Sequence, residues 1–216
     1  MRLVVFDLDG TVTYRDTLAP YLFGFLKRRP VRLVRLIRIV PAVAGYALGL
    51  LGRGQLKSAL LRGTLRGHTR AELEPWTSEF VTALLERELR PQALEAIREH
   101  QRSGDALVLL TAAPDLYAPV IARRLGFQEA ICTGVRWNAD RLDGNLSTPN
   151  RRGEEKARCL EALKRRYPGA QTIAYGNSAA DLPHLKEVDE PRLVNAGPLT
   201  RWKASRVGIA SYAHWR

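Results

Sequence analysis

The sequence predicts an α/β protein built on a Rossmann-like, doubly wound parallel sheet, with a helical domain inserted into it. Short, almost wholly apolar runs alternate with stretches of helical spacing, which is typical of strands that helices cover on both faces. The first two runs, residues 3–7 and 106–111, lie too far apart in the chain for an ordinary crossover. We therefore expect a core domain of residues 1–13 and 90–216, and a cap domain of residues 14–89.

The remaining elements follow in order along the chain. Thr69 and Glu72 form the pattern of a capping box in the cap, and Pro91 suits the first turn of a core helix that Gly104 ends. Strand and helix then alternate to the end of the core. We expect further strands at residues 130–134, 172–176 and 192–195, a hairpin over residues 135–146, and helices over residues 114–127, 153–167 and 178–187.

The composition supports a packed protein. Of the 216 residues, 45% are hydrophobic and 26% are charged, which excludes a disordered or collagen-like chain. The two cysteines, Cys132 and Cys159, form no CxxC pair, so neither a disulfide framework nor a thiolate zinc site is expected. Carboxylates interrupt the first apolar run early, which argues against a secretory signal. We therefore expect a cytoplasmic protein.

Positive charge is concentrated in the expected cap. The chain has 34 Lys and Arg against 22 Asp and Glu, a formal net charge of +12. Residues 13–71 hold twelve of the basic residues and one acid, Asp16. This balance indicates an anionic partner, and nucleic acid, a membrane surface and a phosphorylated substrate are the candidates.

Within the cap, residues 31–52 combine arginines with an apolar run. Arg32, Arg35 and Arg38 fall on one sector of a helix, and the uncharged run that follows is shorter than a membrane-spanning helix. A span over all of residues 31–52 is the long enough alternative, which its three arginines and Pro41 disfavour. A basic stripe beside apolar residues is typical of a helix that lies in a lipid interface. A helix bundle with a solvated arginine face is the alternative.

Four polar clusters fall at the carboxyl ends of expected strands or at the starts of the next helices, where open parallel sheets bind ligands. In the first, Asp7 and Asp9 are two residues apart, so both carboxylates point to one side of an extended chain. Crowded carboxylates repel each other, and a hard divalent cation such as Mg²⁺ relieves that repulsion. A simple turn at Asp9 and Gly10 is the alternative.

The other clusters are weak signals one at a time. Thr111 ends the second strand, and Asp115 after it could merely cap a helix. Lys156 lies in the first turn of a helix, where it opposes the helix dipole and needs an anionic partner unless solvent surrounds it. Asn177 and Asp181 follow another strand, where Asp181 could instead complete a capping box.

Taken together and in this order, the clusters resemble the four motifs of the haloacid dehalogenase superfamily, in its phosphatase branch. The matching positions are Asp7-x-Asp9-Gly10-Thr11, Thr111, Lys156, and Gly176-Asn177 with Asp181. The resemblance covers residues 1–13 and 90–197. The inserted helices are similar in position to the C1-type cap of subfamily IB, which includes phosphoserine phosphatases and phosphatidylglycerophosphatase C.

The resemblance implies a role for each motif residue. Asp7 is expected to attack phosphorus and form an aspartyl-phosphate, while Asp9 protonates the leaving group and later activates water. The substrate is expected to contact Gly10, Thr11, Thr111, Ala112 and Lys156, and the Mg²⁺ ion is expected to contact Asp7, Asp9, Asn177 and Asp181. The family has Asp where this chain has Asn177, and an amide oxygen ligates Mg²⁺ without adding negative charge.

The basic cap favours an anionic, lipid-linked phosphate such as phosphatidylglycerol phosphate, because it has almost no acid with which to recognise an amine. A soluble phosphatase similar to phosphoserine phosphatase is the enzymatic alternative. A basic membrane- or nucleic-acid-binding protein is the non-enzymatic one. Aliphatic rather than aromatic residues interleave with the arginines, so we expect no nucleic acid partner. An anionic membrane partner implies peripheral association with the inner face of the cytoplasmic membrane.

Overall fold

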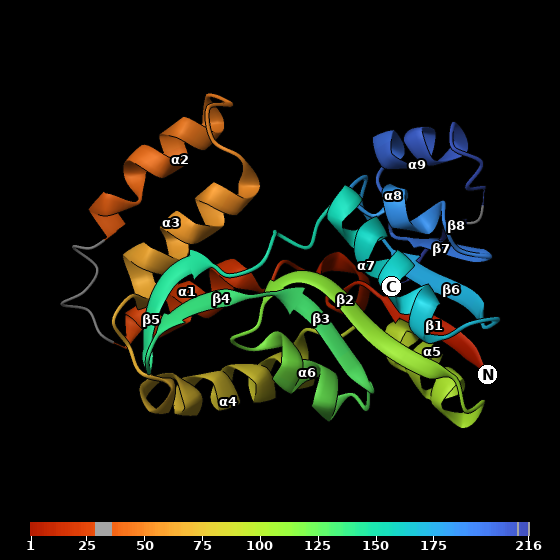
Figure 1. Ribbon diagram of the computed structural model, residues 1–216, viewed down its shortest axis with the longest axis horizontal. Coiled ribbons are helices and arrows are strands. Elements are labelled where there is room, and N and C mark those ends of the chain that lie inside the picture. Colours follow the sequence, from red (N-terminus) through yellow and green to blue (C-terminus); the bar gives the residue numbers. More distant parts are fainter. Residues whose placement is uncertain (29–35, 211, 216) are drawn as a thin grey trace.

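A six-stranded parallel sheet forms the centre of the part of the chain that the computed structural model describes, residues 1–28, 36–210 and 212–215 (Figure 1). The strand order is β3-β2-β1-β6-β7-β8. β1 lies in the middle, with Leu3 opposite Ala106 of β2 on one side and opposite Thr172 of β6 on the other. The strands are β1 (Arg2–Phe6), β2 (Ala106–Pro114), β3 (Glu129–Thr133), β6 (Gln171–Gly176), β7 (Glu190–Val194) and β8 (Tyr212–Ala213).

Alternate residues of the strands build two separate apolar cores. Val4 and Phe6 of β1 belong to one core, and Leu3 and Val5 belong to the other. All four are fully buried, as expected of a strand that is covered on both faces. The predicted doubly wound parallel sheet is confirmed.

Helices cover both faces of this sheet. Residues of α5 (Pro91–Arg102) and α6 (Ala118–Arg124) pack in the core that contains Phe6. Residues of α7 (Glu154–Arg166), α8 (Leu182–Leu185) and α9 (Pro198–Ser205) pack in the core that contains Leu3. Because helices cover both faces of the sheet, the loops that follow the strands gather at the carboxyl ends of the strands.

The described part of residues 14–89 is helical, as predicted. It contains α1 (Leu18–Lys27), α2 (Val40–Ala47), α3 (Arg53–Leu65) and α4 (Arg70–Arg87). The capping box is confirmed, because the Thr69 hydroxyl accepts from Glu72 N at 3.2 Å and the Glu72 carboxylate accepts from Thr69 N at 2.9 Å. Of the three arginines in the predicted basic stripe, Arg32 and Arg35 lie outside the described residues.

The predicted hairpin consists of β4 (Val135–Asn138) and β5 (Arg141–Leu146). It leaves the sheet after β3 and lies against the helices of residues 14–89 (Figure 1). Leu142 N donates to His68 O at 2.9 Å, and Gly67 N donates to Leu142 O at 2.9 Å. The hairpin and the predicted cap are therefore joined by backbone hydrogen bonds although they are distant in sequence.

Several elements differ from the prediction, and the helix α9 is one that was not predicted from the sequence. The edge strand β8 was not predicted, because two residues are too few to show a period. β2 continues beyond Thr111 to Pro114, so α6 starts only at Ala118. The helix expected over residues 178–187 shortens to α8, because the Asp181 carboxylate accepts hydrogen bonds from the turn before it.

Candidate active site

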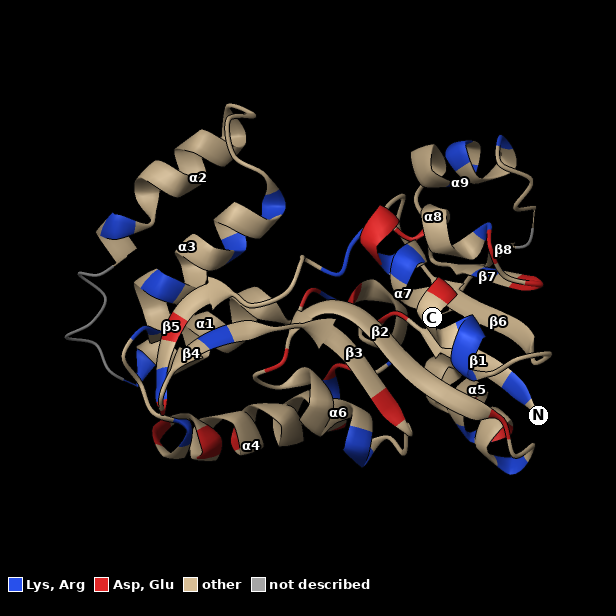
Figure 2. Ribbon diagram, viewed as in Figure 1, with Lys and Arg blue, Asp and Glu red and all other residues tan. Residues whose placement is uncertain are grey.

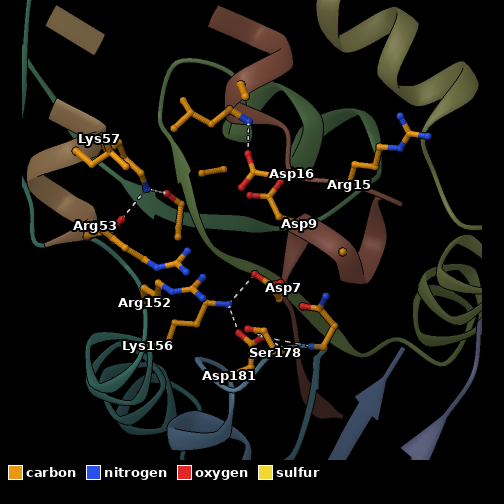
Figure 3. A pocket seen from close by; sticks show the side chains of 18 of the residues that line it. Asp7, Asp9, Arg15, Asp16, Arg53, Lys57, Arg152, Lys156, Ser178 and Asp181 are labelled. Carbon is orange, nitrogen blue, oxygen red and sulfur yellow. Dashed lines mark hydrogen bonds and ion pairs between the residues drawn. The ribbon is translucent and has the colours of Figure 1, made fainter. Parts of the chain in front are cut away.

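The polar clusters meet at the carboxyl ends of the neighbouring strands β1 and β6. Successive strands are added on one side of β1 as far as β3 and on its other side from β6 onward, and such a switch point is where open parallel sheets bind ligands. Asp7 directly follows β1, and its backbone N donates to Tyr175 O of β6 at 3.0 Å. Asp181 lies just beyond the end of β6. Figure 3 shows that Asp7 and Asp181 both point toward Lys156. The pairing of neighbouring strands thus brings together residues that are 174 positions apart in the chain.

Lys156 joins the two carboxylates. Its Nζ donates to Asp7 Oδ1 and to Asp181 Oδ1, each at 2.6 Å. Asp7 is 6% exposed, and Lys156 and Asp181 are 2% exposed each, so the three charges lie almost wholly out of water. The predicted anionic partner of Lys156 is confirmed. Burial lowers the pKa of Lys156, but the two carboxylates more than offset this and raise it overall.

The two carboxylates differ in their ease of protonation. Burial raises the pKa of Asp7, and Lys156 only partly counters this. Burial also raises the pKa of Asp181, but Lys156 and hydrogen bonds reverse the shift and bring it below the ordinary value. Asp181 Oδ2 accepts from Asn177 N, Ser178 N and Ser178 Oγ, at 3.2, 2.9 and 2.8 Å. Asp181 is therefore the firmly ionised member of the pair.

Asp9 lies in the wide turn Leu8–Val12 that follows β1, and its carboxylate is turned toward α1. Its Oδ1 accepts from Thr17 N at 2.9 Å and from Thr17 Oγ1 at 2.7 Å. Burial raises the pKa of Asp9 to about 7, with Asp16 and Asp7 adding to the rise. A carboxylic acid with this pKa can both give and take a proton near neutral pH.

Position 10 requires a glycine for two reasons, the backbone conformation of the turn and the close approach of the Asn177 side chain. Its φ is +81°, in the left-handed region that favours glycine, and a Cβ there would lie 2.1 Å from Asn177 Nδ2. The Asn177 side chain therefore packs directly over Gly10. This contact fixes the first and fourth motifs against each other.

The other residues expected at the substrate have different surroundings. Thr11 is fully buried, and its hydroxyl donates to Asp7 Oδ2 at 3.2 Å. Thr111 is also fully buried, and its Oγ1 accepts from Ala113 N at 3.0 Å. Ala112, Gly10 and Asn177 line the cavity beside Asp7, whereas neither Thr11 nor Thr111 is among the lining residues.

A cavity of about 650 Å³ opens above these motifs, between residues of the core and residues of the helices that follow β1. The lining residues that sequence reasoning missed include Arg53, Lys57, Asn150 and Arg152. Arg53 and Lys57 are four apart on α3 and so share one helix face, which is a signal that the sequence offered. Arg152 lies two residues before the start of α7, and nothing in its local sequence distinguishes it from Arg151.

The donor atoms at the site fit a hard divalent cation. Within the described ranges, no three Asp, Glu, His or Cys side chains converge on a single point. Asp7 and Asp181 nevertheless place two negative charges against one ammonium group, and Asp9 lies nearby. Carboxylate and amide oxygens are ligands that Mg²⁺ accepts, with water completing its coordination. A divalent cation would offset the negative charge that Lys156 leaves unbalanced.

The arrangement agrees with a family comparison. The model of the haloacid dehalogenase-like hydrolases matches residues 4–186. The chain belongs to this family. Its placement as a phosphatase of the haloacid dehalogenase (HAD) superfamily, predicted from the four motifs, is confirmed, while the subfamily and the cap type remain predictions.

Relatives span most of this HAD chain. Protein CicA of Caulobacter vibrioides is 35% identical over 192 residues, 87% of this chain and 83% of CicA. The structure of a protein of unknown function from Bordetella pertussis Tohama I has a TM-score of 0.80 and 26% identity, covering 100% of this chain and 98% of that one. A phospho-aspartyl intermediate analogue of phosphoserine phosphatase has a TM-score of 0.64 and 18% identity, covering 94% and 90%. The last likeness shows the fold alone.

Proposed function

We propose that this HAD phosphatase hydrolyses a phosphomonoester through an aspartyl-phosphate formed on Asp7. The observation that carries the proposal is the Asp7 carboxylate at the floor of the cavity, held by Lys156 and Thr11. A carboxylate is already ionised near neutral pH and needs no base to act as a nucleophile. The phospho-aspartyl analogue of the structural neighbour supports the same chemistry.

Asp7 forms a bond to phosphorus, and the bond from phosphorus to the leaving oxygen breaks. Asp9 gives its proton to that oxygen, which its raised pKa permits. Both hydrogen bonds from Thr17 go to Oδ1, so Oδ2 of Asp9 remains for proton transfer. Asp9 then takes a proton from the water that attacks the aspartyl-phosphate, which releases phosphate and restores Asp7.

The remaining motif residues would hold the phosphoryl group and the metal ion. Lys156 is placed to offset charge on the phosphoryl oxygens. Gly10, Thr11, Thr111 and Ala112 are the further substrate contacts that we propose. Mg²⁺ would be held by Asp7, Asp9, Asn177 and Asp181, and when bound it would supply positive charge against the developing phosphoryl anion.

Mg²⁺ is expected to switch on hydrolysis of an aryl phosphate such as p-nitrophenyl phosphate and to raise the midpoint of thermal unfolding. Binding to the folded state alone at 100 times Kd stabilises by about 2.7 kcal/mol. Asp181→Ala should reduce both responses, because it removes a charged oxygen ligand. Hydrolysis that is unchanged by EDTA, together with an unchanged midpoint, would contradict the metal assignment.

We further propose that the substrate phosphate is linked to lipid and that the enzyme binds the membrane through the region of α2. No helix among the described residues has the length and apolar character needed to cross a bilayer. Residues on and beside α2 nevertheless expose large apolar side chains: Ile37, Val40, Val43, Leu48 and Leu50 are 48–75% exposed. α2 contains no charged residue (Figure 2), whereas Arg38 precedes it and Arg53 begins α3 after the turn that follows. Apolar residues bordered by arginines suit an anionic lipid interface.

Vesicle co-sedimentation tests the membrane proposal. The protein is expected to sediment with anionic vesicles and to be released as salt rises, because charges at a surface are screened within about 8–10 Å. Replacing Ile37, Val40 and Val43 together by Ser should weaken binding about tenfold or more, because apolar burial is lost. Replacing the same three residues by Leu is the matched control and should preserve binding. Equal sedimentation of all three proteins would instead favour a soluble phosphomonoester as substrate.

A further inference from the structure

One wall of the cavity carries positive charge that the catalytic steps do not use. Arg53 begins α3, Lys57 lies one turn later, and Arg152 precedes α7. All three line the same cavity as Asp7 (Figure 3). Segments from two distant parts of the chain thus converge on one place with like charges, which is electrostatically unfavourable unless an anion lies between them.

Lys57 is already held in place. It is 9% exposed, and its Nζ donates to Asn150 Oδ1 at 2.6 Å and to the carbonyl of Ala112. The pKa of Lys57 is lowered to about 8, mainly by burial, with Asp9 and Asp16 opposing the shift and Arg152 and Arg53 adding to it. Its partners are neutral oxygens, so its charge is not cancelled by direct contact.

Arg53 and Arg152 differ from the arginines around them. Arg151 pairs with Glu155, and Arg158 pairs with the same carboxylate at 3.3 Å. Over the described ranges, no carboxylate lies within ion-pair distance of Arg53 or Arg152. Arg53 contacts the ring of Tyr46, whose centroid is 6.0 Å from its Cζ. Both guanidinium groups are therefore free to bind an anion.

We propose that Arg53 and Arg152 form a subsite for a second, non-reacting anionic group of the substrate, a carboxylate or a phosphodiester. Guanidinium groups bind such groups with paired, charge-assisted hydrogen bonds. Tyr46, Leu56 and Leu60 line the cavity beside them, which suits a short carbon chain between the two anions. The proposal rests on the proposed function, since it assumes that the reacting phosphate lies at Asp7.

Matched substrates test the subsite. Glycerol 3-phosphate and 3-phosphoglycerate differ only in that a carboxylate of the second replaces a hydroxymethyl group of the first. The wild type is expected to have a kcat/KM for 3-phosphoglycerate that is at least about tenfold higher than its kcat/KM for glycerol 3-phosphate. Arg53→Gln and Arg152→Gln should each lower the ratio of these two values about tenfold, mainly by raising the KM for 3-phosphoglycerate. Arg102→Gln at the end of α5, beside the start of β2 and far from the site, is the control and should keep the ratio. Arg53→Lys should retain part of the preference for 3-phosphoglycerate, because it keeps the positive charge.

Two lipid-derived substrates distinguish the sources of the second anion. Glycerophosphoglycerol phosphate carries the phosphodiester of a lipid headgroup without acyl chains, and dispersed phosphatidylglycerol phosphate carries both. A preference that is lost in Arg53→Gln and Arg152→Gln for any of these substrates supports the subsite. An equal kcat/KM for one-anion and two-anion substrates in the wild type, or a ratio that neither variant changes, would overturn it while leaving the phosphatase assignment in place. Absence of hydrolysis of every phosphomonoester would overturn both.

Discussion

Asp7→Asn is expected to lower turnover by at least about four orders of magnitude while the protein remains folded. The amide has nearly the shape of the carboxylate, but its oxygen is a poor nucleophile. The structural cost is limited because Lys156 keeps Asp181 as a partner at 2.6 Å. Steady-state hydrolysis of an aryl phosphate, with circular dichroism to verify folding, measures both parts.

Asp140→Asn serves as the control for this variant. Asp140 is exposed in the turn between β4 and β5, far from the carboxyl end of β1. Its removal changes the net charge equally and should leave turnover within about twofold. If folded Asp7→Asn retained wild-type turnover, the nucleophile would have to be a different residue.

Lys156→Met is expected to destabilise the fold as well as to remove activity. Two buried carboxylates would then face each other without a cation, and removal of one partner from a buried ion pair costs about 3–5 kcal/mol. The sign of the pH dependence follows from their pKa values. Without Lys156, both rise above their unfolded values, so the loss of stability is largest near neutral pH and shrinks as pH falls and the carboxyls protonate.

Chemical denaturation of the wild type and the variant at pH 8 and pH 5 measures this effect. Arg158→Met on the same helix is the control, because Arg158 is exposed and its loss should change stability by less than about 1 kcal/mol. Mg²⁺ should restore part of the stability of Lys156→Met by replacing the missing positive charge. A free energy of unfolding equal to that of the wild type at pH 8 would show that Lys156 does not neutralise this cluster.

The strands and the motifs at their ends could be predicted because each has a local signal. Leu3 to Phe6 form an uninterrupted apolar run, which is typical of a strand buried on both faces, and Asp7 follows at its end. The position of Lys156 in a first helical turn predicted that it needs an anion, and Asp7 and Asp181 meet that need. The pairing of β1 with β6 then brings Asp7 close to Asp181.

What could not be predicted depends on contacts between distant segments. Two contacts at the site are of this kind. Asn177 packs over Gly10, and Thr17 N donates to Asp9 Oδ1, and both contacts form only when the segments that carry these residues pack together. The placing of Arg53 near Arg152 depends on how α3 packs against β5 of the hairpin, which no periodicity encodes. Residues in such positions look like ordinary surface residues in the sequence.

The backbone bonds between β5 and the helices of residues 14–89 join two segments that leave the sheet at different points of the chain. Those helices connect to the sheet through a pair of segments, where Arg90 N donates to Val12 O at 3.0 Å. The hairpin connects through a second pair, where Ser147 N donates to Gly134 O at 2.9 Å. Because β5 is bonded to these helices along its backbone, a displacement of α3 would carry the hairpin with it, so the two segments are mechanically coupled.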